Sequence, residues 1–260
     1  MPKMNERALL QAAGEIFRAE PRLIELNGVD RAIFVGDTHG DLEATQRVIE
    51  RYFQPGTALV FLGDYVDRGP HSRENLTCLL TLKVANPKQI YLLQGNHDAW
   101  QDAPFYPAEF WESLSSKEQT LYAETLAQLP WALATPNGML ALHGALPAVD
   151  NLKKINSIVF GSEEWQQITW GDWQDAPGYF LGDHGGRPQF GREYFQRQME
   201  RLKRTVLVRG HQSRAPTFLF DDRCLTIFTS CAYSSHKRQV AIASLDQEVR
   251  TARDLILESV

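Results

Sequence analysis

The chain contains little cysteine and no long apolar segment. Three cysteines, Cys78, Cys224 and Cys231, occur among its 260 residues, and none belongs to a Cys-x-x-Cys pair. An odd, unclustered set of cysteines argues against a disulfide framework and favours a reducing compartment. Nowhere do about eighteen apolar residues follow one another, as a transmembrane helix requires. We therefore expect neither a disulfide-stabilised secreted protein nor a membrane protein.

An excess of basic residues is also absent. The formal net charge is −5, whereas general nucleic-acid binding favours a basic surface. The segment up to Arg18 contains acidic residues and lacks the apolar run of a signal peptide. We expect a cytoplasmic protein without a membrane or nucleic-acid partner. Because no repeat, low-complexity stretch or linker divides the chain, we expect one domain over residues 1–260.

Five short apolar runs lead directly into residues that can bind metal ions and that stand next to glycine. Buried strands are predicted for these runs, at residues 32–35, 58–62, 90–93, 139–142 and 206–208. The residues that follow the runs are Asp37 and His39, then Asp64, Asn96, His143 and His211. In open α/β sheets, ligand-binding residues collect at the carboxyl ends of the strands. We therefore expect these six side chains to meet at one place.

Helical spacing of apolar residues alternates with the first strands, which indicates βαβ units and an α/β fold. Helices are predicted at residues 5–20, 41–53, 71–84, 111–129 and 192–204. Residues 165–188 are rich in glycine, aspartate and tryptophan and predict a substrate-facing loop. Alternating patterns at residues 224–229 and 239–245 predict further, antiparallel strands. His71 and His236 are expected at the surface.

The candidate ligands suit a pair of divalent cations. Asp37 and His39 are two positions apart, so in extended backbone both point the same way and can reach one ion. The two carboxylate oxygens of Asp64 can bridge two ions. Carboxylate, amide and imidazole ligands without thiolate suit Mn²⁺, with Fe or Zn as alternatives. Two ions roughly 3.5–4 Å apart stabilise an in-line displacement and generate hydroxide near neutral pH.

Five sequence motifs resemble those of the phosphoprotein phosphatase family of serine/threonine phosphatases, in a prokaryotic branch. The motifs read GDTHGD, GDYVDRG, GNHD, HGA and RGHQ, in this order, at residues 36–41, 63–69, 95–98, 143–145 and 209–212. The resemblance covers roughly residues 8–245 and includes a Trp-Gly-Asp segment at residues 170–172. It implies the calcineurin-like metallophosphoesterase fold, in which a central β-sandwich of mixed sheets is flanked by helices.

The resemblance also implies roles for individual residues. It assigns the first metal to Asp37, His39 and Asp64, and the second to Asp64, Asn96, His143 and His211. The implied catalytic set is His97, the acid that protonates the leaving group, with Asp67, which supports it, and Arg68, which binds phosphate oxygens. A histidine next to a ligand could also be an extra ligand or a structural residue.

Further phosphate contacts are implied for Asn96 and for Tyr233, which matches a tyrosine that borders the family's groove. The second phosphate-binding arginine of the family has two candidate positions. Counting back from Phe190 leads to His184, whereas Arg187 lies three residues later, and we choose Arg187 because its permanent charge suits phosphate. The usual arginine before the GNH motif is replaced by glutamine, Gln94.

We predict a serine/threonine protein phosphatase that acts on phosphoproteins or phosphopeptides. Its expected reaction is phosphomonoester hydrolysis by direct attack of a metal-bound hydroxide. The alternative is a hydrolase of dinucleoside polyphosphates such as diadenosine tetraphosphate, because a related branch of the family also has GNHD. A non-catalytic binding module is disfavoured, since all six ligands and His97, Asp67 and Arg68 are present.

Overall fold

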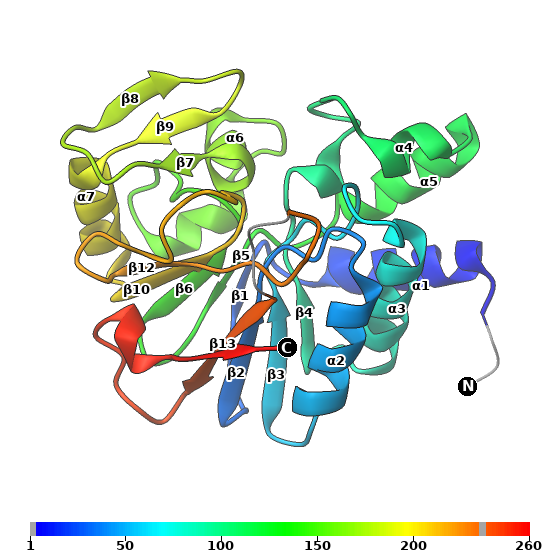
Figure 1. Ribbon diagram of the computed structural model, residues 1–260, viewed down its shortest axis with the longest axis horizontal. Helices are drawn as coiled ribbons and strands as arrows, with labels where there is room; N and C mark the ends of the chain where they lie inside the picture. Colours follow the sequence, from blue (N-terminus) through cyan, green and yellow to red (C-terminus); the bar gives the residue numbers. More distant parts are fainter. Residues whose placement is uncertain (1–3, 234–237) are drawn as a thin grey trace.

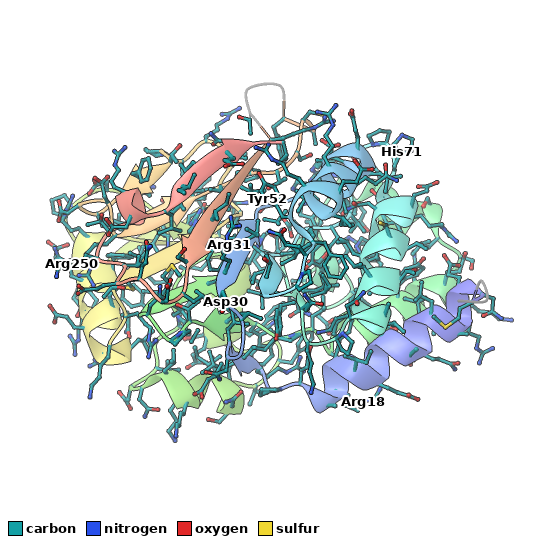
Figure 2. All side chains as sticks on the ribbon, turned by 90° about the horizontal axis from the view of Figure 1, so that it is seen from below. Arg18, Asp30, Arg31, Tyr52, His71 and Arg250 are labelled. Carbon is teal, nitrogen blue, oxygen red and sulfur yellow. The ribbon has the colours of Figure 1, made fainter. Side chains whose placement is uncertain are left out.

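The computed structural model describes residues 4–233 and 238–260, which form two larger mixed sheets, one small sheet and the helices around them (Figure 1). His71 is exposed at the edge of the molecule, as predicted (Figure 2), whereas His236 lies outside the described residues. Within the described ranges, no helix is long and apolar enough to cross a membrane.

The first sheet has the strand order β14-β13-β2-β3-β4. Its strands are β2 (Arg31–Val35), β3 (Thr57–Phe61), β4 (Ile90–Leu92), β13 (Gln239–Ser244) and β14 (Ile256–Ser259). β2, β3 and β4 are parallel, and Val35 pairs with Phe61, which pairs with Leu92. The carboxyl ends of these three strands therefore lie side by side, and β13 joins β2 in the antiparallel direction.

The second sheet has the strand order β1-β5-β6-β10-β12-β11. Its strands are β1 (Leu23–Glu25), β5 (Ala132–Ala134), β6 (Met139–Leu142), β10 (Val206–Arg209), β11 (Phe218–Leu219) and β12 (Cys224–Thr226). β6 and β10 are parallel neighbours and end together. β12 runs parallel to β10 and antiparallel to β11, so the predicted antiparallel pairing is right for β13 and holds for β12 on one side only.

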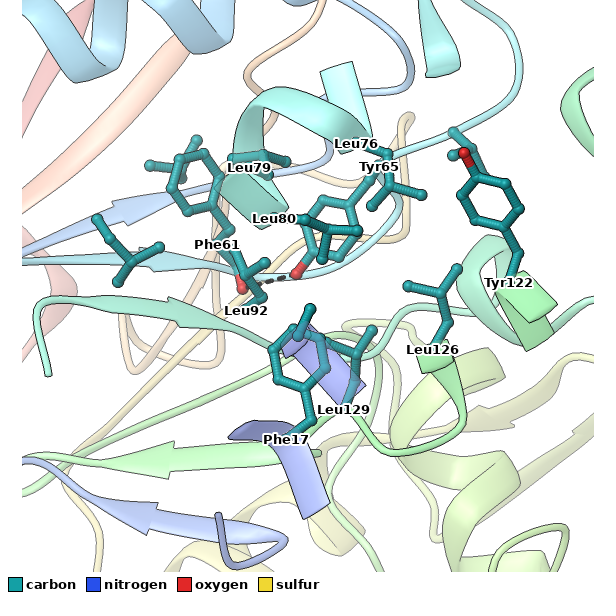
Figure 3. Close-up of a cluster of buried hydrophobic side chains, with 14 of the residues drawn as sticks. Phe17, Phe61, Tyr65, Leu76, Leu79, Leu80, Leu92, Tyr122, Leu126 and Leu129 are labelled. Atoms are coloured by element: carbon teal, nitrogen blue, oxygen red, sulfur yellow. Dashed lines mark hydrogen bonds between the residues drawn. The ribbon is translucent and has the colours of Figure 1, made fainter. Parts of the chain in front are cut away.

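The two sheets pack face to face because each of their central strands is apolar on both faces. In β2, Ala32 and Phe34 point into the core between the sheets, whereas Ile33 and Val35 point to the opposite face. On that outer face of the first sheet lie α1 (Glu6–Ala19), α2 (Leu42–Tyr52), α3 (Ser72–Ala85) and α5 (Ser116–Leu126). Figure 3 shows part of this outer core, where Phe17 of α1 packs near Phe61 and Leu92.

The outer face of the second sheet is covered by α6 (Glu163–Trp170) and α7 (Arg192–Leu202). Leu140 and Leu207 of the sheet pack there with Trp165 and Phe195 of these helices. The architecture is therefore a β-sandwich of mixed sheets flanked by helices. This confirms the predicted α/β architecture with two mixed sheets between layers of helices.

Two segments differ from their predictions. Residues 165–188 are not a loop, because they include most of α6 and contribute β7 (Asp172–Trp173), β8 (Phe180–Asp183) and part of β9 (Pro188–Phe190), which form the small sheet. The predicted helix at residues 111–129 is two helices, α4 (Glu109–Ser113) and α5. Ser115 starts α5 with a capping box in which its side chain and that of Glu118 exchange hydrogen bonds with the backbone.

The buried side chain of Gln94 joins the two sheets just beyond β4. Its carbonyl oxygen accepts hydrogen bonds from the indole N–H groups of Trp131, at 3.1 Å, and Trp165, at 2.8 Å. Its amide nitrogen donates to the carbonyl oxygen of Leu126 at 2.8 Å. An arginine side chain has donors only and could not accept from either indole. The two tryptophans thus explain why glutamine stands at this position.

We expect Gln94→Met to lower the free energy of unfolding by about 2–4 kcal/mol, because each buried polar group left unpaired costs roughly 1–3 kcal/mol. Urea denaturation measures this change, provided that the m-value stays constant. Gln11→Met, on the exposed face of α1, serves as the control and should leave stability unchanged. Equal stability of the Gln94 variant and the wild type would contradict this role.

Candidate metal centre

The carboxyl ends of β2, β3, β4, β6 and β10 bring the predicted ligands together in a buried cluster. Asp37, His39, Asp64, Asn96, His143 and His211 are each at most 7% exposed. His39 Nε2 lies 3.7 Å from Asp37 Oδ2 and 3.6 Å from Asp64 Oδ2. His143 Nε2 lies 3.3 Å from Asp64 Oδ2 and 3.1 Å from Asn96 Oδ1. The predicted convergence of these side chains is therefore present.

Asp64 belongs to both halves of the cluster. One group of potential ligand atoms comes from His39, Asp64 and His97, and the other comes from Asp64, His143 and His211. Within each group these atoms lie within 4.8 Å of one another. This is the arrangement that a carboxylate bridging two ions requires, and it supports the predicted role of Asp64. The first group also contains His97, so a ligand role for that residue stays open.

Backbone carbonyl groups set the orientation of two histidines. The Nδ1 atom of His39 lies 2.9 Å from the carbonyl oxygen of Val66, and that of His143 lies 2.9 Å from the carbonyl oxygen of Leu62. An N–H at Nδ1 that donates to a carbonyl leaves Nε2 unprotonated in the neutral ring, so that its lone pair is available to a metal ion. Both Nε2 atoms face the Asp64 carboxylate, as ligands of a common centre should.

The backbone at the first motif differs from the expected extended conformation. His39 has a φ of 42°, and Asp64 has a φ of 56°. Both residues are therefore left-handed, a conformation that side chains disfavour and that clusters at functional sites. Asp37 and His39 still approach each other, but by means of a tight turn in which Thr38 and His39 donate their N–H groups to the backbone oxygen of Asp64.

Glycine allows the last ligand loop to approach the first. A Cβ atom at Gly210 would overlap Oδ1 of Asp37. The absence of a side chain there lets the N–H of His211 donate to both Asp37 oxygens, at 3.1 and 3.2 Å. Gly210 therefore joins the end of β10 to the end of β2, although the two strands belong to different sheets.

Asp172, at the start of β7, was not among the predicted site residues. Its Oδ1 atom lies 3.4 Å from Nε2 of His211, which is buried without a hydrogen-bond partner among the described residues. The same carboxylate accepts two hydrogen bonds from Arg187, at 2.8 and 2.9 Å. Asp172 thus links the Arg187 guanidinium to the cluster of predicted ligands. The Trp-Gly-Asp resemblance was the signal that could have identified it.

Asp98 is a second unpredicted member, which holds two ligand loops together. Its buried carboxylate accepts from the N–H groups of Asp64 and Gly95, both at 2.8 Å, and of Tyr65 at 3.1 Å. These bonds connect the loop after β3 with the loop after β4. Burial, together with the charge of Asp64, raises the pKa of Asp98 to about 7.

The cluster concentrates negative charge where water cannot screen it. Burial, with a further contribution from Asp64, raises the pKa of Asp37 to about 6. Burial also disfavours the Asp64 carboxylate, but the imidazoles of His143 and His97 outweigh it and hold the pKa of Asp64 well below its usual range. Burial lowers the pKa of His39 and of His211. The uncharged imidazoles of His39 and His211, next to buried carboxylates, are suited to a bound cation.

The proposed acid pair lies beside this cluster. His97 Nδ1 is 2.8 Å from Asp67 Oδ2, and both side chains are buried. The other Asp67 oxygen accepts from the N–H of Phe110 at 2.8 Å. The His97 ring makes an edge contact with the ring of His39, with 4.7 Å between centroids. The structure therefore brings His97 and Asp67 together, as the sequence motifs implied.

Arg68 directly follows Asp67 of the acid pair and is more exposed than that pair. Its Nη1 atom donates to the Pro107 carbonyl oxygen at 2.7 Å and to Glu109 at 3.2 Å. Its guanidinium carbon is 5.8 Å from the centroid of the Phe105 ring, and that ring contacts His97 at 4.3 Å. Phe105 and Glu109 were not predicted as site residues, because only the folded chain places them against the GDYVDRG loop.

The remaining predicted phosphate contacts fall on two sides of the cluster. Tyr233 packs against His39 with ring centroids 5.5 Å apart, and its hydroxyl group lies near Arg68. Arg187 lies on the opposite side, bound to Asp172. His184 is exposed at the turn between β8 and β9, where its N–H donates to the Arg187 carbonyl oxygen. Arg187, not His184, is thus connected to the cluster through Asp172.

The metallophosphoesterase signature extends over most of the chain. Residues 31–214 match the family of calcineurin-like phosphoesterases. The chain therefore belongs to this family of hydrolases, and its resemblance to the phosphoprotein phosphatases is confirmed by the relatives described next. Its assignment to a prokaryotic branch stays a prediction.

Among curated proteins, the chain is similar to two serine/threonine-protein phosphatases T. It is 27% identical to the protein of Saccharomyces cerevisiae over 250 residues, which cover 90% of this chain and 49% of that protein. It is 28% identical to the protein of Aspergillus oryzae over 243 residues, which cover 86% and 51%. The chain thus spans about half the length of these relatives.

Solved structures confirm the fold. The structure of a protein serine/threonine phosphatase from Saccharomyces cerevisiae, described as similar to human phosphatase PP5, superposes with a TM-score of 0.85 at 24% identity, covering 100% of this chain and 90% of that one. The crystal structure of a putative diadenosine tetraphosphatase gives a TM-score of 0.54 at 21% identity, covering 92% and 98%. The first of these structures is the better match to this chain's architecture.

We expect Asp64→Asn to remove more metal than Asn96→Ala, because Asp64, unlike Asn96, offers an oxygen ligand to both halves of the cluster. Elemental analysis of dialysed protein, before and after addition of Mn²⁺, measures the metal content per chain. Circular dichroism checks that both variants are folded. An Asp64→Asn protein that retains as much tightly bound metal as the wild type would contradict the bridging role.

Proposed function

We propose that this chain is a metal-dependent protein serine/threonine phosphatase, with residues 1–260 forming one catalytic domain. The observation that carries this proposal is the ligand cluster, in which Asp64 belongs to both halves. The His97–Asp67 pair and Arg68 lie next to that cluster. Binding of a phosphate monoester needs cationic groups around the phosphate, and cleavage needs a proton donor for the departing oxygen. The ligand cluster, the two arginines Arg68 and Arg187, and His97 can supply both.

We assign the cluster to two divalent ions, with Mn²⁺ as the first choice and Fe or Zn as alternatives. The donor set fits such ions, because it combines carboxylates, an amide oxygen and imidazoles without thiolate. Asp37, His39 and Asp64 would hold one ion, and Asp64, Asn96, His143 and His211 the other. When bound, the ions would neutralise phosphate charge and activate a water molecule as the nucleophile.

Two arginines are proposed to bind the substrate phosphate from different sides. Arg68 and His97 both contact the ring of Phe105, whereas Asp172 connects Arg187 to His211. A guanidinium group offers two parallel N–H donors to phosphate oxygens and keeps its charge at any physiological pH. Asn96 and Tyr233, which borders Arg68, complete the proposed phosphate contacts.

His97 is proposed as the acid that protonates the leaving oxygen. Its Nδ1 atom is paired with Asp67, so the orientation of the ring is set. The Nε2 atom at the other side of the ring is then the proton donor. A serine or threonine alkoxide is strongly basic, so its departure depends on such a proton.

The proposed substrates are phosphoproteins or phosphopeptides, as the names of the relatives suggest. Hydrolysis of dinucleoside polyphosphates is the less supported alternative, because the similarity to the putative diadenosine tetraphosphatase is limited to the fold. A cytoplasmic location is proposed from the cysteines, all three of which are free thiols.

Purified protein with added Mn²⁺ should hydrolyse a phosphoserine peptide faster than diadenosine tetraphosphate. A phosphotyrosine peptide, assayed in parallel, defines the amino-acid preference. Chelator should abolish the activity and Mn²⁺ should restore it, because the proposed reaction needs the ligand cluster to be filled. A clear preference for the dinucleotide would contradict the proposed substrate class while leaving the metallophosphoesterase assignment in place.

We expect the loss of activity in His97→Ala to depend on the leaving group. With a phosphoserine peptide, kcat should fall by roughly 10²- to 10⁴-fold, the scale of general acid catalysis. With p-nitrophenyl phosphate the fall should be much smaller, because p-nitrophenolate leaves without a proton. Asp67→Asn should show a milder form of the same pattern, since Asp67 acts on the reaction only by orienting the imidazole.

Metal content and thermal stability of the His97 variant serve as controls. A ligand role for His97 predicts that both substrates lose activity together and that metal is lost. Equal losses on the two substrates, with metal content unchanged, would remove His97 from the role of acid.

A further inference from the structure

Glu109, the first residue of α4, makes a three-point contact with Arg68. Its Oε2 atom accepts from the backbone N–H of Arg68 at 3.3 Å and from Nη1 at 3.2 Å, and its Oε1 atom lies 3.4 Å from Nη1. The neighbouring Pro107 carbonyl oxygen accepts from the same Nη1 atom at 2.7 Å. One end of the guanidinium group is thus bound by the segment that leads into α4.

The backbone that carries Arg68 is also held by α4. Asp67 and Arg68 have φ angles of 65° and 68°, so both residues adopt the left-handed conformation. Such a pair persists only when its surroundings stabilise it. The N–H of Phe110 donates to Asp67 Oδ1, and the Glu109 carboxylate accepts from the N–H of Arg68. Consecutive residues of α4 therefore hold consecutive residues of the loop.

We infer that Glu109 is a positioning residue that fixes the Arg68 guanidinium for the phosphate of the substrate. This inference rests on the proposed phosphatase function, in which Arg68 contacts phosphate. A free arginine side chain has many rotamers, and ordering it on binding would cost affinity. Holding one end of the guanidinium before the substrate arrives removes part of that cost.

The opposite effect is also physically conceivable, because a carboxylate could compete with phosphate for Arg68. The exposure of the two side chains decides between these effects. The Glu109 side chain is 53% exposed and that of Arg68 is 22% exposed, so water screens the attraction between their charges. The geometric restraint, which combines backbone and side-chain contacts, is therefore the larger effect.

Four variants of α4 test the inference in the full chain with Mn²⁺. Glu109→Ala removes the contact, and Glu109→Gln keeps an amide oxygen that can still accept from Arg68. Glu112→Ala and Glu112→Gln are the matched controls, since Glu112 lies on the same helix and accepts from the N–H of Ala108 instead. The readouts are KM and kcat for a phosphoserine peptide and for p-nitrophenyl phosphate, and inhibition by inorganic phosphate.

In Glu109→Ala, KM and the inhibition constant of inorganic phosphate should rise by roughly tenfold, the scale of a contact to a charged group. The rise should be equal for both substrates, because Arg68 contacts the phosphate and not the leaving group. Glu109→Gln should recover most of the affinity, and both Glu112 variants should behave as wild type. Added to Arg68→Ala, the Glu109→Ala change should raise KM by much less than it does in the wild type, because only the contact with the backbone N–H of residue 68 is then lost.

Three results would overturn the inference. These are tighter phosphate inhibition in Glu109→Ala, unchanged inhibition, or a loss that adds fully to that of Arg68→Ala. Calorimetric titration of inorganic phosphate separates this outcome from failure of the proposed function. A wild-type protein that binds phosphate but hydrolyses no monoester would contradict the phosphatase proposal, and the comparison of Glu109 and Glu112 variants would still decide the role of Glu109 in holding Arg68.

Discussion

The structure of the site depends on one buried carboxylate, that of Asp64. Its Oδ2 atom faces His39 and His143, and its Oδ1 atom accepts from the N–H of His97. Its backbone oxygen accepts from two N–H groups of the first ligand loop, and its own N–H donates to Asp98. The loops after β2, β3 and β4 are therefore connected through a single residue, which explains why its left-handed backbone is tolerated.

A buried carboxylate of this kind is unstable without compensation, because desolvation of a charge costs several kcal/mol. Part of the compensation comes from imidazole, since the charge of Asp64 raises the pKa of His143 to about 9, although burial alone would lower it. A divalent cation would compensate more completely and would release the proton from His143. The cluster's electrostatics and its ligand chemistry therefore point in the same direction.

Much of this arrangement could be predicted from the sequence, because the strand ends are marked by apolar runs followed by glycine and a ligand. The small sheet could not, since β7 and β9 contain only two and three residues and exist through their pairing rather than through any periodic pattern. Asp98 and Glu109 were missed for a related reason. Their function lies in backbone N–H groups that they bind, and Glu109 stands 41 positions away from Arg68.

The sequence alone also cannot explain why residue 94 is a glutamine. The motifs alone mark Gln94 as a departure from the family pattern, whereas the structure shows that its carbonyl oxygen serves two indole groups from different elements. The glutamine is thus accounted for by its hydrogen bonds to the two tryptophans. This difference from the family pattern leaves the predicted metal ligands unchanged.

The two proposed phosphate-binding arginines are held by a common device. Arg187 is bound through two nitrogens by Asp172, which also faces His211, and Arg68 is bound through Nη1 and its backbone by Glu109. In each case a carboxylate outside the ligand set fixes a flexible cation near the ligand cluster. Preorganised charge contributes most to catalysis when it need not rearrange as the reaction proceeds. The carboxylates around the cluster therefore serve two purposes, since some can bind metal ions and others orient the arginines that would meet the phosphate.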